Sequence, residues 1–217
     1  MNKIIDVENL IKIYKMGYFP MAENAESEEI FFYQPKKRFI IPINSFHIPK
    51  KLFIEFKKDK YEFFINKNFS EVIKRCSTTK RKNNGTWINK IIIDTYIELY
   101  EKDYAISIEC YHDKKLVGGL YGLYIGACFF GESMFSEISN TSKLSLLYLI
   151  SILKEHNFNL LDSQFHNQHL LQFGAYEISS KSYLQILNYN INKKCLFPKK
   201  FNFEKSYSIL QSFNHKS

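Results

Sequence analysis

One glycine-rich apolar stretch, residues 116–136 with the sequence LVGGLYGLYIGACFFGESMFS, constrains the fold more than any other segment. It is typical of two consecutive buried strands, and it holds five of the 8 glycines in the chain. Glycines inside strands indicate a bulge, or a ligand or second backbone that comes close. Glu132 lies at the end of this run, where a carboxylate must be paired, neutralised or used. The stretch therefore predicts a buried sheet with a polar group at one end.

A second apolar strand, residues 158–162, ends in the same way, at Asp162 and then Gln164. Residues two apart in a strand share a face, so Asp162 and Gln164 are expected to point the same way. The same rule places Phe130, Glu132 and Met134 on one face. We therefore expect Glu132 to meet Asp162 and Gln164 at one edge of the sheet. Two structural alternatives stay open, a salt-bridged strand end for Glu132 and a helix cap for Asp162.

The alternation of strand and helix patterns along the chain predicts an α/β (α+β) protein with a mixed sheet. Three prolines, Pro35, Pro42 and Pro49, interrupt the chain early, so we expect a small N-terminal lobe over residues 1–45 and a main domain over residues 46–217. Asp6 can cap a first helix. The helix after Asn140 is apolar almost all round and should be buried. Residues 206–217 read as a polar tail.

Composition favours an anionic partner and argues against a metal centre. The net charge is +8 with a pI near 9.1, which attracts nucleic acids electrostatically. The 4 cysteines are scattered and form no ligand cluster, so no metal or cofactor is expected. No apolar run is long enough to span a bilayer and no signal peptide is evident, so we expect a cytoplasmic protein.

Six motifs in the right order resemble the leucyl/phenylalanyl-tRNA–protein transferase family over roughly residues 14–187. They are YKMGYFPM (14–21), FFYQP followed by Arg38, GTWI (85–88), the 116–136 stretch followed by NTSK (140–143), LDSQ (161–164), and His169 with FGA (173–175). Any one of them is weak, but together they are specific. The chain departs from the family pattern at Phe32 and Tyr33, where the family has two tryptophans. It also begins close to its first helix, so we expect the small lobe to be shortened.

The resemblance implies a GNAT-like acyltransferase domain and an aminoacyl-tRNA substrate. Family members transfer leucine or phenylalanine from tRNA to the α-amine of proteins that begin with Arg or Lys, which marks those proteins for degradation. By this resemblance Gln164 would accept a hydrogen bond from the attacking amine, Asp162 would orient the Gln164 carboxamide, and Glu132 would hold the α-ammonium of the donor. Trp87 with Phe32 or Tyr33 would grip the terminal adenosine, helped by Arg38. We expect a monomer.

Two larger sets complete the expected site. An apolar slot for the donor side chain, roomy enough for Leu, Phe and Met, would be lined by Leu120, Met134, Leu146, Leu149 and Leu153. A track for the tRNA backbone would comprise Lys36, Lys37, Arg38, Lys50, Lys51, Lys57, Lys58, Lys80, Arg81 and Lys82. Two alternatives remain: a non-catalytic tRNA- or RNA-binding module, which would need the track but not Glu132, Asp162 or Gln164, and another GNAT-fold acyltransferase. The turn at residues 136–142 lacks the glycines that cradle pyrophosphate, which argues against a coenzyme A enzyme.

Overall fold

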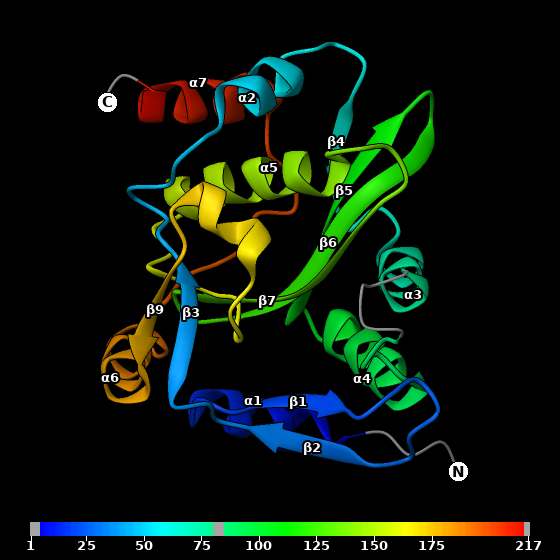
Figure 1. The fold of residues 1–217 in the computed structure, drawn as a ribbon, viewed down its shortest axis with the longest axis vertical. Helices are drawn as coiled ribbons and strands as arrows, with labels where there is room; N and C mark the ends of the chain where they lie inside the picture. Colours follow the sequence, from blue (N-terminus) through cyan, green and yellow to red (C-terminus); the bar gives the residue numbers. More distant parts are fainter. Residues whose placement is uncertain (1–4, 80–84, 215–217) are drawn as a thin grey trace.

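The computed structural model describes residues 5–79 and 85–214 and shows a mixed α/β protein (Figure 1). Its helices are α1 (Val7–Lys15), α2 (Lys50–Phe56), α3 (Phe69–Thr78), α4 (Lys90–Glu101), α5 (Thr141–Glu155), the 3-10 helix η1 (Gln168–Phe173), α6 (Ser180–Asn190) and α7 (Phe203–Asn214). Its strands are β1 (Phe19–Ala22), β2 (Ile30–Tyr33), β3 (Lys37–Ile41), β4 (Glu62–Ile65), β5 (Ala105–His112), β6 (Lys115–Ile125), β7 (Cys128–Ser136), β8 (Leu160–Asp162) and β9 (Tyr176–Ser179). The prediction of a mixed sheet is confirmed.

Seven strands form one large sheet in the order β4-β5-β6-β7-β8-β3-β9, and β1 pairs with β2 in a separate two-stranded sheet. Strands β7 and β8 are parallel, because the long helix α5 connects them, and the other pairs are antiparallel. Strand β3 falls within residues 1–45 yet lies between β8 and β9 in the large sheet. The separate small sheet is therefore shorter than the lobe expected from the prolines.

Helices cover both faces of the large sheet (Figure 1). One core packs α2, α5 and α7 on one face, and the other packs α1, α3, α4 and α6 on the opposite face. Helix α5 is buried over most of its length, as its apolar sequence predicts. The Asp6 side chain accepts a hydrogen bond from the Asn9 amide, 2.8 Å away, so the predicted cap of α1 is confirmed. The polar tail is wrong as a prediction: α7 fills most of it, and its Leu210 is fully buried.

A β-bulge at Glu132 changes the face of strand β7. Tyr121 of β6 is opposite Ser133, whereas the next residue, Gly122, is opposite Gly131, so Glu132 has no partner in the ladder. Phe130, before the bulge, packs in the core with α1 and α4, whereas Met134, after it, packs in the core with α5. The prediction that Phe130, Glu132 and Met134 share one face is therefore wrong, because the extra residue breaks the period of two.

Glycine is required opposite the bulge. A Cβ added at Gly122 would lie 2.2 Å from the Phe130 carbonyl oxygen and 2.6 Å from the Phe129 ring. The two strands approach too closely there for any side chain. The glycines of the 116–136 stretch thus indicate a bulge and a close backbone approach, the reading that their density predicted.

Among the described residues, no helix is both long enough and apolar enough to cross a membrane.

Candidate active site

The candidate site begins where β7 and β8 part. Their ladder ends at the pair Phe130–Asp162, and the chain then turns sharply through Gln164, whose backbone has φ of +60°. Phe39 of β3 holds this turn: its carbonyl accepts from the Ser163 amide at 3.0 Å, and its amide donates to the Gln164 carbonyl at 3.0 Å. Asp162 closes the turn, because its Oδ1 accepts from the Gln164 backbone amide at 2.9 Å. The main chain of Gln164 is therefore fixed on both sides.

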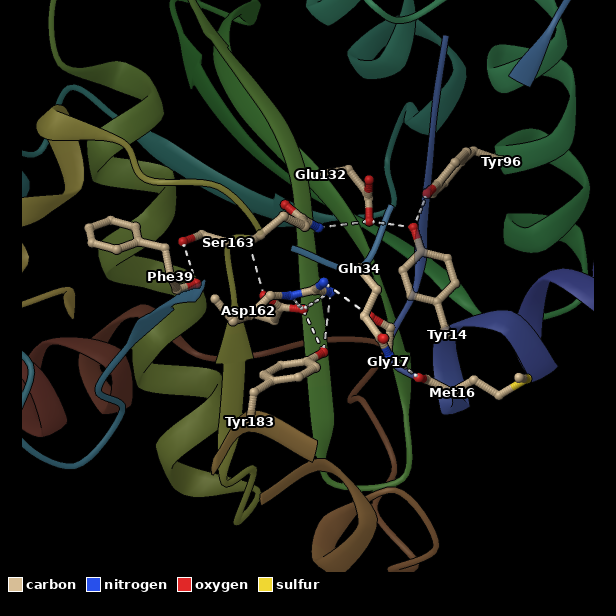
Figure 2. Close-up of polar contacts among 12 residues, drawn as sticks. Tyr14, Met16, Gly17, Gln34, Phe39, Tyr96, Glu132, Asp162, Ser163 and Tyr183 are labelled. Carbon is tan, nitrogen blue, oxygen red and sulfur yellow. Dashed lines mark hydrogen bonds and ion pairs between the residues drawn. The ribbon is translucent and has the colours of Figure 1, made fainter. Parts of the chain in front are cut away.

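Glu132 and Gln164 meet across the gap between β7 and β8. Figure 2 shows Glu132 beside Tyr14 and Tyr96. The Gln164 Nε2 donates to Glu132 Oε1 at 3.2 Å, and the Tyr14 hydroxyl donates to the same oxygen at 2.7 Å. The Tyr14 hydroxyl also shares a short hydrogen bond with the Tyr96 hydroxyl. A chain of hydrogen bonds thus runs from α4 through α1 to the bulge of β7 and on to Gln164.

The surroundings of Glu132 favour its neutral form. Burial raises the pKa of this carboxyl to about 8, although the hydrogen bonds from Tyr14 and Tyr96 oppose the rise. Burial and the nearby Glu132 carboxyl likewise raise the pKa of Tyr14 and of Tyr96 well above the usual value. A carboxyl that titrates near neutrality within a polar cluster is typical of a functional site.

Asp162 is held by a buried ion pair with Arg38. The guanidinium Nε lies 2.9 Å from Oδ1, Nη2 lies 2.6 Å from Oδ2, and the two side chains are 1% and 0% exposed. The Tyr183 hydroxyl also donates to Oδ2, at 2.8 Å. The expectation that Arg38 grips the terminal adenosine does not fit this placement, because its guanidinium is buried and already occupied by Asp162.

The structure brings the three predicted catalytic residues together, with one difference in detail. Asp162 contacts the backbone amide of Gln164, not its carboxamide, and the carboxamide is held by Glu132. The hydrogen bonds of Tyr14 and Tyr96 in the site were not predicted from the sequence. Both residues are fully buried, and a tyrosine at helical spacing on an apolar face looks like an ordinary core residue. Their hydroxyl groups were the only signal.

The expected adenosine-binding aromatic residues lie on different elements. Phe32 and Tyr33 are exposed on β2, whereas Trp87 lies in the segment before α4 and packs partly buried against the core on that side. Phe165, which follows Gln164, is exposed and brings its ring centroid to 6.1 Å from that of Tyr33. Phe165, which no sequence motif marks, extends the aromatic surface of β2 up to the turn of Gln164.

The expected apolar slot lies on the α5 face of the sheet. Leu120 of β6 is directly opposite Met134 of β7, and both pack with the core that contains α5. The three predicted leucines of α5, which are at most 2% exposed, belong to the same core; they are Leu146, Leu149 and Leu153. Because of the bulge, this set lies on the face opposite Tyr14 and Phe130, and Glu132 lies where the two faces meet.

The expected basic track is spread over the molecule. Lys36 precedes β3 and Lys37 begins it, near the small sheet (Figure 1). Lys50 and Lys51 begin α2 at the opposite end of the molecule (Figure 1). All four lysines are exposed, as are Lys57 and Lys58, and Lys37 also pairs with Glu177 at 2.9 Å. Lys80, Arg81 and Lys82 lie outside the described residues.

Within residues 5–79 and 85–214, no group of three or more His, Cys, Asp or Glu side chains is placed to hold a metal ion. The groups that the site does offer are a carboxamide, two carboxyls and several tyrosine hydroxyls. Such groups hold and orient amines and esters through hydrogen bonds. The site therefore suits a group transfer that depends on positioning.

Comparisons with known proteins place the chain more narrowly. Residues 40–188 match the family model described as leucyl/phenylalanyl-tRNA protein transferase. A leucyl/phenylalanyl-tRNA–protein transferase from Zymomonas mobilis is 42% identical over 86% of this chain and 70% of its own length. A protein of the same description from Phenylobacterium zucineum is 40% identical over 82% of this chain and 80% of its own length.

Two solved structures also align with the chain, a conserved protein of unknown function from Staphylococcus epidermidis and L-PGS from Bacillus licheniformis. The first covers 82% of this chain and 66% of its own, with a TM-score of 0.43 and 13% identity. The second covers 96% and 70%, with a TM-score of 0.40 and 12% identity. Likeness at this level carries no argument about function.

The fold and the site together with these matches define the protein first as a transferase. More narrowly, the chain belongs to the leucyl/phenylalanyl-tRNA protein transferase family, because the family model matches most of it and relatives of about 40% identity extend over more than four-fifths of it. The resemblance found in the six sequence motifs is confirmed.

Proposed function

We propose that this protein transfers leucine or phenylalanine from aminoacyl-tRNA to the α-amine of proteins that begin with Arg or Lys, and so marks them for degradation. The observation that carries the proposal is the pairing of the Gln164 carboxamide with Glu132 at the edge of the sheet, in a chain of this family. The acceptor rule and the GNAT-like character of the main domain rest on the family resemblance. We propose that the protein acts as a monomer.

The chemistry requires little acid or base strength. A protein α-amine has a pKa of about 7.7–8.0, so a useful fraction is already neutral near pH 7. The amine attacks the ester carbonyl, the new amide bond forms, and the 3′-terminal ribose oxygen of the tRNA leaves with a proton. What the protein must supply is the placement of the amine against the carbonyl.

Gln164 is suited to this placement. Its Nε2 donates to Glu132, so its Oε1 is the atom directed to accept a hydrogen bond from the attacking amine. The fixed main chain of Gln164 limits how far the carboxamide can move. We assign to Gln164 the role of orienting the acceptor amine, and to Asp162 that of fixing the Gln164 backbone.

Glu132 is suited to the ammonium of the donor amino acid. An adjacent ammonium favours the ionised carboxylate, so binding of the donor is expected to lower the pKa of Glu132 from about 8 toward its ordinary range. The donor side chain would then extend into the apolar set of Leu120, Met134 and α5. This set carries no acid, which argues against an arginyl donor.

The tRNA is expected to contact aromatic and basic surfaces around the site. Trp87 with Phe32 or Tyr33 would stack on the terminal adenosine, since any base offers a π-face. The exposed lysines of the basic track would meet phosphates, since a tRNA is large enough to reach lysines at both ends of the molecule.

The test is an acceptor assay with radiolabelled Leu-tRNA and, separately, Phe-tRNA. Peptides that differ only in their first residue, Arg, Lys, Asp or Ala, would serve as acceptors. Label on the Arg and Lys peptides alone supports the proposal. Label on the Asp peptide would mean that the acceptor rule differs, and absence of label on every peptide with tRNA still bound would favour a binding module.

A further inference from the structure

Arg38 joins the two halves of the candidate site. Its Nε and Nη2 bind the Asp162 carboxylate, and its Nη1 donates to the Gly17 carbonyl at 3.1 Å. Asp162 fixes the backbone of Gln164, whereas Gly17 ends the turn that follows α1, the helix that carries Tyr14. Tyr14 in turn holds Glu132. One guanidinium thus contacts both supports of the Gln164–Glu132 pair.

We propose that Arg38 is a positioning residue for aminoacyl transfer, and that Tyr183 assists it. The pair sets the distance between the two groups that would receive the substrates, the Gln164 carboxamide and the Glu132 carboxyl. Neither Arg38 nor Tyr183 touches a substrate in this account. The inference rests on the proposed function of the same site.

The surroundings of Arg38 hold its guanidinium in one orientation. Its Cζ lies 4.6 Å from the centroid of the Phe19 ring and 4.4 Å from that of Tyr183. Rings at these distances confine a planar cation. The N–H groups of the planar guanidinium form a fork that binds both oxygens of a carboxylate. A lysine has neither the plane nor the fork, so it could neutralise Asp162 without fixing its direction.

Tyr183 fixes the second oxygen of Asp162. Its hydroxyl donates to Oδ2 at 2.8 Å, and the Arg38 Nη2 reaches the same hydroxyl at 3.3 Å. Because α6 carries Tyr183, a helix outside the sheet also holds the Asp162 carboxylate. Phenylalanine at this position keeps the ring over Arg38 and removes only the hydroxyl.

The experiment measures kcat and KM for Leu-tRNA with an Arg-peptide acceptor, in wild type and in the variants Arg38→Lys and Tyr183→Phe. The matched control is Tyr189→Phe, on the same helix but 74% exposed. Denaturation curves and the stoichiometry of tRNA binding establish that each variant is folded. We expect kcat to fall about 100-fold for Arg38→Lys and about tenfold for Tyr183→Phe, with KM within twofold of wild type, because misplacement of reacting groups lowers the chemical step.

A double variant separates positioning from general stability. In an Asp162→Ala background the acceptor of the Tyr183 hydroxyl is gone, so Tyr183→Phe should cause less than a twofold further loss of the single-turnover rate. The same tenfold loss in both backgrounds would overturn the proposal. An unchanged kcat for Tyr183→Phe would also overturn the proposal. If Arg38→Lys does not fold, Tyr183→Phe is the variant that decides. Absence of transfer by wild type would instead refute the proposed function, and the positioning role with it.

Discussion

Replacement of Glu132 by glutamine tests whether burial keeps this carboxyl neutral. Glu132 accepts hydrogen bonds from Tyr14 and from Gln164, and these two reach the same oxygen, Oε1. A glutamine can present its carbonyl oxygen at that position and keep both bonds. The variant Glu132→Gln therefore mimics the protonated carboxyl and removes only its titration.

The sign of the effect follows from the raised pKa. The folded-state pKa is about 8 against an ordinary value of 4.5, so between these values the unfolded chain releases the proton and the folded chain keeps it. Wild type therefore loses stability as the pH rises through this window, and the loss levels off above the folded-state pKa. Glu132→Gln has no such loss.

The full pKa shift of Glu132 would correspond to about 5 kcal/mol of the free energy of unfolding. Because the side chain is only half-buried, we expect wild type to lose about 2–3 kcal/mol of stability between pH 5 and pH 8. For a chain of this length that is a relative change in Tm of about 5–10 °C. Urea and thermal unfolding of both proteins at pH 5, 6.5 and 8 measure it, with the exposed Glu29→Gln as control. A constant difference between wild type and Glu132→Gln across these pH values would refute the reasoning.

Three further predictions concern binding, the bulge and the apolar slot. Binding of Leu-tRNA should weaken steeply with salt, by at least tenfold between 50 and 200 mM, if several lysines of the basic track meet phosphates; a flat dependence in a filter-binding assay would argue against the track. Gly122→Ala should lower the free energy of unfolding by about 2 kcal/mol or more, because its Cβ would meet the Phe130 carbonyl, whereas Gly85→Ala, with open space around it, should be nearly neutral in the same urea titration. Leu149→Ala should cost about 2–5 kcal/mol of stability, and competition between Phe-tRNA and Leu-tRNA should shift toward Phe if this leucine also limits the slot; an unchanged ratio would assign Leu149 to the core alone.

Sequence patterns predicted the central strands β5, β6 and β7 because these are long, apolar and bounded by turns. They failed where tertiary contacts decide the structure. The short strand β3 lies among prolines, yet it pairs on both sides in the sheet. Helix α7 contains many polar residues, and its place is set by buried side chains such as Leu210. A chain segment of this kind shows its structure only once its neighbours are known.

The candidate site was predictable in part for the same reason. Polar residues at the ends of two apolar strands were enough to bring Glu132, Asp162 and Gln164 together. Strict alternation could not reveal the bulge at Glu132, which depends on how β7 pairs with β6. The contact between Arg38 and Asp162 joins residues 124 apart in sequence, so no local pattern could show it.

The central claim is that Gln164 acts on the transfer step and not on tRNA binding. The most direct measurement compares Gln164→Ala with wild type in single-turnover transfer of leucine to an Arg-peptide, together with the Kd for Leu-tRNA of each protein. We predict a loss of about 100-fold in the transfer rate, with the Kd within twofold of wild type. Equal losses in rate and affinity, or a transfer rate close to that of wild type, would contradict the account.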